Sequence, residues 1–146
     1  MLIWHVDSFA AEPTERGRSK LADETPQAVR VEEALVVFAA SEKSDEPEPD
    51  AVAERAVTAL VDVARRLGER TIVLHSFAHL FVELSSPATA KAIRDKMQAE
   101  LEAQGYRVQQ SAFGWPSLHF RVLVLRFPAL VERRLPHVAS AHSHAA

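Results

Sequence analysis

The pattern of apolar and polar stretches along the 146-residue chain predicts strands alternating with helices. Short apolar or alternating runs, which are typical of strands, lie at residues 1–6, 34–40, 71–74, 107–109 and 118–125. The polar stretch 7–30 predicts a loop or an irregular hairpin. The acidic stretch 41–50 holds two prolines and predicts a linker.

Two segments show the spacing of amphipathic helices. In residues 50–67 the apolar side chains fall on one face, with Asp50 as an expected N-cap and Gly68 as an expected stop. The second helix begins with Ser86 as its cap and ends at Gly105. It is expected to bury Ala90, Ile93, Met97 and Leu101. We therefore predict a single α/β domain, a mixed β-sheet with two main helices.

The domain is expected to span residues 1–136, followed by a flexible tail at 137–146. The tail carries His137, His142 and His144 among small and polar residues. Three histidines could bind a metal, but no predicted element holds them in place. A disordered tail is therefore the favoured interpretation.

Composition limits the function classes. The chain has no cysteine, which excludes disulfides, thiolate zinc sites and cysteine nucleophiles. It has no apolar run of ~18 residues, so we expect no membrane span, and we expect a cytoplasmic protein. The net charge of -3 disfavours a surface that coats nucleic acid. A few local arginines could still hold the end of an RNA.

Two histidines follow the predicted strand 71–74. His75 and His79 are four residues apart, a spacing that could hold a metal on a helix, but a third ligand is not evident. A histidine presented to a substrate at a strand end is the preferred interpretation. A structural histidine is the alternative.

Two other groups could contribute to a site. His5 and Asp7 end the first strand, and residues i and i+2 of a strand share a face, so both could point into one cleft. Phe113, Gly114 and Trp115 precede the last strand. There, the glycine permits an unusual turn and the indole offers a stacking surface. Structural alternatives are a capping aspartate with an edge histidine, and a tight turn whose tryptophan closes the core.

In this order the motifs resemble the N-terminal editing domain of archaeal-type threonyl-tRNA synthetases. The matching stretches are His5-Val6-Asp7, the run from Val31 to Phe38, Glu42-Lys43, Phe77-Ala78-His79-Leu80 with Glu83-Leu84 and Pro87, Gly105-Tyr106, and Ala112-Phe113-Gly114-Trp115.

The resemblance implies a fold like that of the D-aminoacyl-tRNA deacylases, a homodimer, and hydrolysis of serine wrongly esterified to threonine tRNA. It implies that the partner is a tRNA 3′ end carrying an amino acid. It implies no cofactor, since a water attacks the ester in this family. A chain of this length would be a free-standing form that acts in trans, with a threonyl-tRNA synthetase chain as a further candidate partner.

The resemblance assigns the site residues one by one. His79 corresponds to the pocket histidine, and His5 and Asp7 to the strand-end pair, so these three are the expected catalytic residues. The expected substrate-binding residues are Phe77, Ala78, Phe113, Gly114, Trp115, Ser117, His119 and Glu132.

The chain departs from the family at two places. The family has Gly-aromatic-aromatic-Lys, with a lysine important for hydrolysis, where this chain has Gly114-Trp115-Pro116-Ser117. The family's later histidine is absent from the segment 126–132, and Glu132 reaches the family glutamate's place only after a shift of one. Ser117 cannot replace a positive charge, whereas a protonated His119 could.

Three hypotheses follow from these departures. The first is an editing hydrolase. The second is a non-catalytic module that binds aminoacyl-adenosine or a tRNA end. The third is a related deacylase with another amino-acid specificity.

Overall fold

The computed structural model describes residues 1–80, 82–115, 120–122 and 131–132. It contains one six-stranded sheet in the order β4-β3-β2-β1-β5, with β6 also paired to β1. The strands are β1 (Leu2–Ala11), β2 (Val29–Ala39), β3 (Thr71–Ser76), β4 (Arg107–Gln110), β5 (Phe120–Val122) and β6 (Val131–Glu132). The helices are α1 (Pro49–Leu67) and α2 (Pro87–Ala103), with short 3-10 turns η1 (Lys43–Asp45) and η2 (Ala78–Leu80).

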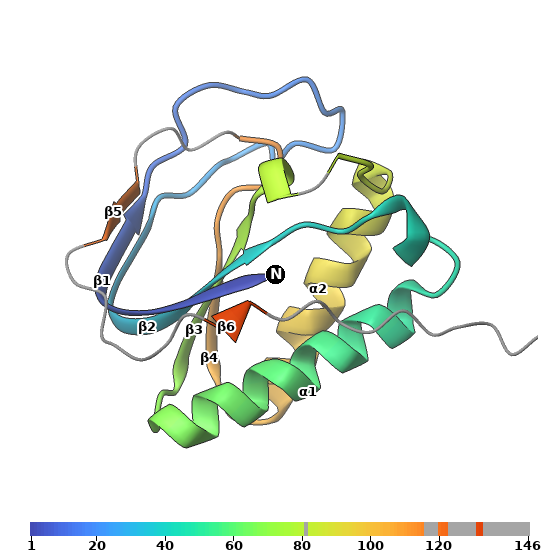
Figure 1. Ribbon diagram of the computed structural model, residues 1–146. Coiled ribbons are helices and arrows are strands. Elements are labelled where there is room, and N and C mark those ends of the chain that lie inside the picture. The colour runs from blue at the N-terminus through green and yellow to red at the C-terminus, as the bar shows by residue number, and fades with distance from the viewer. Residues whose placement is uncertain (81, 116–119, 123–130, 133–146) are drawn as a thin grey trace, which may run out of the picture.

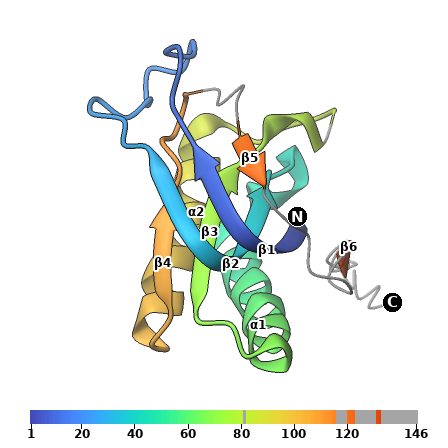
Figure 2. The ribbon, with the colours of Figure 1, turned by 90° about the vertical axis from the view of Figure 1, so that its left-hand side faces the viewer.

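The sheet is mixed. β1 runs antiparallel to β2, β5 and β6, whereas β2, β3 and β4 are parallel to one another. Both main helices lie on one face of the sheet, as Figures 1 and 2 show. The prediction of a single α/β domain with a mixed sheet and two main helices is confirmed. The likeness to the deacylase fold stays a prediction.

The helix boundaries follow the expected end signals. α1 begins with Pro49 and ends before Gly68, whose φ of 70° is left-handed. The expectation that Asp50 caps α1 is wrong, because Asp50 is the second residue of the helix and Glu48 holds the cap position. In α2 the Thr89 N–H donates to Ser86 Oγ at 3.2 Å, so the predicted Ser86 cap is confirmed.

The buried face of α2 is largely as predicted. Ile93, Met97 and Leu101 are buried, while Ala90 is half-buried. The helix ends at Ala103, two residues before Gly105.

Apolar side chains cover both faces of the sheet. The helix-side core joins β1, β2 and β3 to α1 and α2, and its largest fully buried members are Ile3, Leu35, Leu60, Ile72, Leu74 and Leu101. A second core on the opposite face contains Val6, Phe9, Ala11, Val29, Ala34, Val36, Phe38 and Val73. The central strands are therefore buried on both sides, which explains their continuous apolar sequences.

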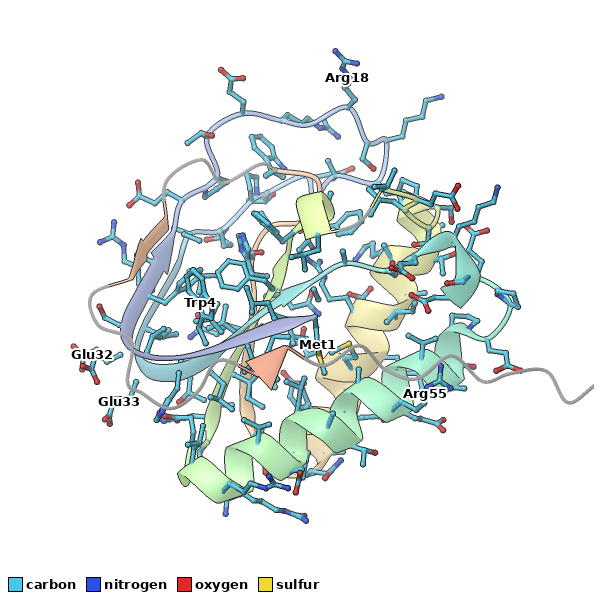
Figure 3. All side chains as sticks on the ribbon, in the orientation of Figure 1. Met1, Trp4, Arg18, Glu32, Glu33 and Arg55 are labelled. Carbon is cyan, nitrogen blue, oxygen red and sulfur yellow. The ribbon has the colours of Figure 1, made fainter. Side chains whose placement is uncertain are left out.

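The hairpin of β1 and β2 is longer than expected. Of the two alternatives for residues 7–30, a loop or an irregular hairpin, the structure has the hairpin, since Ser8–Ala11 pair with Val29–Glu32 in antiparallel register. Long-range pairing outweighs the polar composition here. The remaining loop closes over one end of the sheet, and Arg18 at its outer bend points away from the molecule (Figure 3).

The regular alternation of faces breaks within this hairpin. Val6 and Phe9 are three residues apart yet belong to the same core, and so do Val31 and Ala34. Glu33 has a φ of 28°, which is unusual for a non-glycine residue. The pairing register omits residues 7 and 33. The alternation of faces therefore cannot be followed from residue 6 to residue 9, and a shared face for His5 and Asp7 stays a prediction.

Only part of the C-terminal prediction lies within the described residues. Residues 120–122 form β5, whereas the rest of the predicted strand 118–125 and the tail 137–146 lie outside them. β6 was not predicted. Within the described ranges, no helix is both long and apolar enough to cross a bilayer.

Candidate functional site

The candidate site lies where the parallel strands β3 and β4 end. β3 finishes with His75 and Ser76, and the chain passes through Phe77 into η2, which contains Ala78 and His79. β4 finishes at Gln110 and leads into the turn of Phe113, Gly114 and Trp115. The carboxyl ends of neighbouring parallel strands are where α/β folds place ligands.

His75 is enclosed by aromatic rings on the face away from the helices. Its ring centroid lies 5.3 Å from that of Phe38 and 5.9 Å from that of Phe9, both edge-on. Burial, and secondarily the charge of Arg94, lower the pKa of His75 from 6.5 to about 4. His75 is therefore neutral at pH 7, as the structural interpretation of this histidine requires.

His75 and His79 do not form the helical i,i+4 pair that would suit a metal, because His75 is in β3 and His79 is in η2. Among the residues that the structure describes, no three histidine, aspartate or glutamate side chains gather closely enough to hold a metal ion.

Phe77 anchors the segment that leads to His79. Its N–H donates to the Ala39 carbonyl at 2.8 Å, and its ring lies edge-on to Phe38 at 5.7 Å. The Phe77-Ala78-His79-Leu80 motif thus starts from a fixed point on the sheet.

The Phe113–Trp115 turn is held by the loop between β1 and β2. The Phe113 N–H donates to Asp23 Oδ2 at 2.7 Å, and the Asp23 N–H donates to the Phe113 carbonyl at 3.0 Å. The Trp115 Nε1–H donates to the Asp23 carbonyl at 2.9 Å. The Gly17 N–H donates to the Gly114 carbonyl at 2.8 Å. The turn is thereby fixed by residues about ninety positions away in sequence.

Gly114 is required at this turn for two reasons. Its φ of 72° is left-handed, and a β-carbon at this position would lie 2.7 Å from the Ala22 β-carbon. The close approach of the two backbones therefore depends on a residue without a side chain.

Arg94 in α2 is a site residue that the sequence analysis missed. Its Nη1 donates to Ser76 Oγ at 3.1 Å and to the Ser111 carbonyl at 2.9 Å. Its guanidinium carbon lies 4.9 Å from the centre of the Phe113 ring. One signal was available, since position 94 falls on the same helical face as Ala90, Met97 and Leu101, where a charge is unexpected.

His5 is not brought to this edge. It pairs with Leu35, which belongs to the helix-side core, and directly opposed residues of antiparallel strands share a face. Its Nε2 lies 3.5 Å from Glu69 Oε2. His5 pairs with Leu35 of β2, and Leu35 pairs with Ile72 of β3. Ile72 precedes His75 by three residues, which is about 10 Å along the strand. His5 thus lies on the helix-covered face, and its expected part in catalysis stays a prediction.

The structure describes only one of the three remaining predicted site residues. Ser117 and His119 lie outside the described residues. The backbone of Glu132 pairs with Leu2 in β6, and three strand spacings separate it from His75. The structure thus brings together the strand end before His79 and the Phe113–Trp115 turn.

A polar cleft of about 470 Å³ lies at the opposite edge of the sheet, near the start of β2 and β3. It is lined by Arg30, Val31, Glu32, Glu33, Glu69, Arg107 and Gln109. Glu32 and Glu33 point outward at this edge in Figure 3. Charges of both signs line the cleft, and none of its lining residues belongs to the candidate site.

Residues 1–125 match the model of a protein family described as the archaea-specific editing domain of threonyl-tRNA synthetase. The match covers every described residue of the candidate site.

The chain is also similar to threonine–tRNA ligases. It is 40% identical over 117 residues to the ligase of Methanopyrus kandleri, and 39% identical over 115 residues to that of Methanococcus maripaludis. It is 35% identical over 118 residues to the ligase of Thermococcus kodakarensis. These matches cover 78–79% of this chain but only 18–19% of the ligases, so the chain spans less than a fifth of their length.

Proposed function

Because this chain belongs to the family of archaea-specific editing domains of threonyl-tRNA synthetase, we propose that it hydrolyses serine wrongly esterified to threonine tRNA. One structural observation supports this most. Arg94 contacts both Ser76, just before the Phe77–Leu80 motif, and Phe113 of the aromatic turn. Two segments that the family resemblance assigns to one pocket are therefore neighbours in space.

The proposed activity would supply selectivity between threonine and serine. Threonine and serine differ by one methyl group, which discriminates between them by only about 1–3 kcal/mol in a binding pocket. A separate site that hydrolyses the wrong ester supplies the selectivity that binding alone lacks.

In the proposed reaction a water molecule attacks the ester carbonyl of the aminoacylated terminal adenosine. The carbonyl carbon gains a bond to the water oxygen, the ester bond to the ribose oxygen breaks, and the ribose oxygen takes up a proton. We assign to His79 the positioning of the substrate or of this water. Phe113 and Trp115 would form the wall against which the adenosine lies, with Phe77 and Ala78 beside it.

For His5 we propose a structural role in place of a catalytic one. Its imidazole lies beside Glu69 on the helix-covered face, and Glu69 Oε1 accepts the N–H groups of Arg70 and Thr71. We therefore propose that the contact of His5 with Glu69 links β1 to the connection between α1 and β3. Asp7, half-buried in β1, stays a candidate for substrate contact.

A second function is a binding module that has lost hydrolysis. It is favoured by the replacement of the family's lysine at the turn with Ser117. A donor to the developing oxyanion is worth about 2.7–4 kcal/mol, so its loss would be severe without a substitute.

One assay separates the two functions. The purified chain is incubated with seryl-, threonyl- and D-aminoacyl-tRNA, and loss of the ester is followed over time. Selective hydrolysis of seryl-tRNA for threonine, reduced about 10²-fold or more in His79→Ala, supports editing. Thr58→Ala, on the exposed face of α1, is the matched control and should retain the wild-type rate.

The outcomes are distinct. No ester loss together with retained binding of a non-hydrolysable seryl-adenosine analogue would establish the binding module instead. Faster loss from D-aminoacyl-tRNA would establish a deacylase of other specificity. Because the chain is assayed alone, turnover would also show that it acts in trans.

The proposed assembly is a homodimer that acts on the tRNA 3′ end in the cytoplasm, beside or without a synthetase chain. Light scattering on the purified protein tests the dimer. A mass equal to the 16.2 kDa of one chain would contradict it.

A further inference from the structure

Arg94 is a charged side chain that is buried in the fold. Its side chain extends from α2 to the carboxyl ends of β3 and β4, and the residue is only 5% exposed. Burial lowers its pKa, whereas the charges of Asp23 and Asp95 raise it. The guanidinium remains protonated at neutral pH, since arginine is not deprotonated in proteins.

The contacts of Arg94 do not include a close counter-charge. Within the described part of the chain, no carboxylate lies within 4.0 Å of its guanidinium nitrogens, and its Nε has no hydrogen-bond partner there. Its acceptors are a hydroxyl and a carbonyl. A buried ion in such surroundings is more costly than an apolar side chain of similar volume. Such an ion is more often retained for a functional site than for stability.

The position of Arg94 identifies what the charge could serve. Ser76 immediately precedes the Phe77-Ala78-His79-Leu80 motif, and Ser111 lies two residues before Phe113. One nitrogen of Arg94, Nη1, donates a hydrogen bond to Ser76 Oγ and another to the Ser111 carbonyl. The guanidinium also lies against the Phe113 ring, an arrangement that favours a cation. Arg94 therefore fixes the distance between the two walls of the candidate site.

We propose that Arg94 is a positioning residue of the editing site, which holds the segment leading to His79 and the Phe113–Trp115 wall in register with each other. This inference rests on the proposed function. Arg94 does not contact the ester. It acts through Ser76, Ser111 and Phe113. Its positive charge lies behind the Phe113–Trp115 wall, which is followed by Ser117 where the family has a lysine.

The proposal predicts opposite effects on stability and on function. Arg94→Met keeps most of the side-chain volume but removes the charge and both hydrogen bonds. Its melting temperature should stay at or above the wild-type value, because the buried charge is gone. Its kcat/KM on seryl-tRNA for threonine should fall about 100-fold, as expected when a site wall is displaced by about 1 Å. Arg94→Lys keeps a charge and should lose less, about tenfold.

The same variants are tested for binding of 3′-seryl-amino-3′-deoxyadenosine, which cannot be hydrolysed. The Kd of Arg94→Met should rise about tenfold. Lys96→Met, two residues along α2 and half-buried beside Glu54 of α1 and Glu100, is the control away from the site and should match the wild type in Kd and kcat/KM.

Three results would overturn the proposal. These are unchanged kcat/KM and Kd in Arg94→Met, loss of folding in Arg94→Met, and a wild-type chain that neither hydrolyses the ester nor binds the analogue. If the wild type binds the analogue without hydrolysing any ester, only the proposed hydrolysis fails. Arg94 is then judged by the Kd alone, where a tenfold rise supports the proposal and no rise overturns it.

Discussion

Asp23 and Phe113 are hydrogen-bonded to each other in both directions, although ninety residues separate them. The Phe113 N–H donates to the Asp23 carboxylate at 2.7 Å, and the Asp23 N–H donates to the Phe113 carbonyl at 3.0 Å. This reciprocal pair makes the β1–β2 loop part of the candidate site. The loop is thus a structural support for the aromatic turn, not only a connection between two strands.

Replacing Asp23 with alanine should destabilise the protein by about 1–3 kcal/mol, because the Phe113 N–H loses its acceptor in a part-buried position. Asp23→Asn should cost less, since its side-chain oxygen still accepts a hydrogen bond. Urea unfolding at pH 7 measures both. Glu24→Ala, at the exposed neighbouring position, should change stability by less than about 0.5 kcal/mol. Equal effects at positions 23 and 24 would contradict the assigned role.

Replacing Gly114 with alanine should be more costly than the same change at Gly68. The two glycines have φ values of 72° and 70°, so the backbone strain of about 1 kcal/mol is shared. Only at Gly114 does the new β-carbon meet a distant residue, since it would lie 2.7 Å from the β-carbon and 2.8 Å from the α-carbon of Ala22, whereas a β-carbon added to Gly68 points into open space. The difference in the free energy of unfolding therefore isolates the close contact, and we expect about 1–3 kcal/mol.

The Gly114 prediction has an internal check. Combining Gly114→Ala with Ala22→Gly removes the Ala22 β-carbon but leaves the Ala22 α-carbon, which would lie 2.8 Å from the new β-carbon. The double variant should therefore recover only a small part of the lost stability, and full recovery would contradict a backbone contact at this position.

His75 should make the protein less stable as the pH falls from about 6.5 towards 4. Burial lowers the pKa of folded His75 to about 4, while the unfolded chain binds the proton near 6.5. The unfolded state therefore holds more protons in this window, and stability falls with pH. Between pH 6.5 and pH 5 the expected loss from this residue is about 2 kcal/mol.

The measurement compares urea unfolding of wild type and His75→Phe at pH 7 and pH 5. Phenylalanine fits the aromatic surroundings of Phe9 and Phe38 and does not titrate. The other titrating groups are common to both proteins, so the difference reports on His75. Parallel loss of stability in the two proteins would show that His75 titrates normally in the folded state.

His5→Gln should lower stability while leaving catalysis within about threefold of wild type. The reason is its place beside Glu69 on the helix-covered face, about 10 Å along the strands from the row of His75. Thermal unfolding and the seryl-tRNA assay are run on the same preparations. A large drop in kcat with an unchanged melting temperature would restore His5 to the catalytic residues.

The sequence was sufficient for the elements whose signals are local. α2 was predicted from apolar spacing and from Ser86, and the serine caps the helix as expected because its oxygen accepts a nearby N–H. β3 was predicted from a short apolar run, and the start of β4 was predicted at residues 107–109. The end of β3 beside His75 and the turn at Gly114 were likewise visible in the sequence, because strand ends and glycines mark positions of special geometry.

What the sequence did not predict depends on contacts between distant residues. β1 extends to Ala11 because residues of β2 pair with it, and the pairing skips residues 7 and 33, where Glu33 has a φ of 28°. The bonds of Asp23 to Phe113 and of Arg94 to Ser76 join segments that share no local pattern. The only local signal for these contacts was Arg94 itself, a charged residue on the apolar face of α2.

The position of β1 has a consequence for how the chain folds as it is synthesised. β1 is made first, and it pairs with β2 on one side and with β5 and β6 on the other. Until residues 120–132 leave the ribosome, one edge of β1 has no strand to pair with. An unpaired edge is a template for association with other chains. Truncation before Phe120 should therefore promote aggregation.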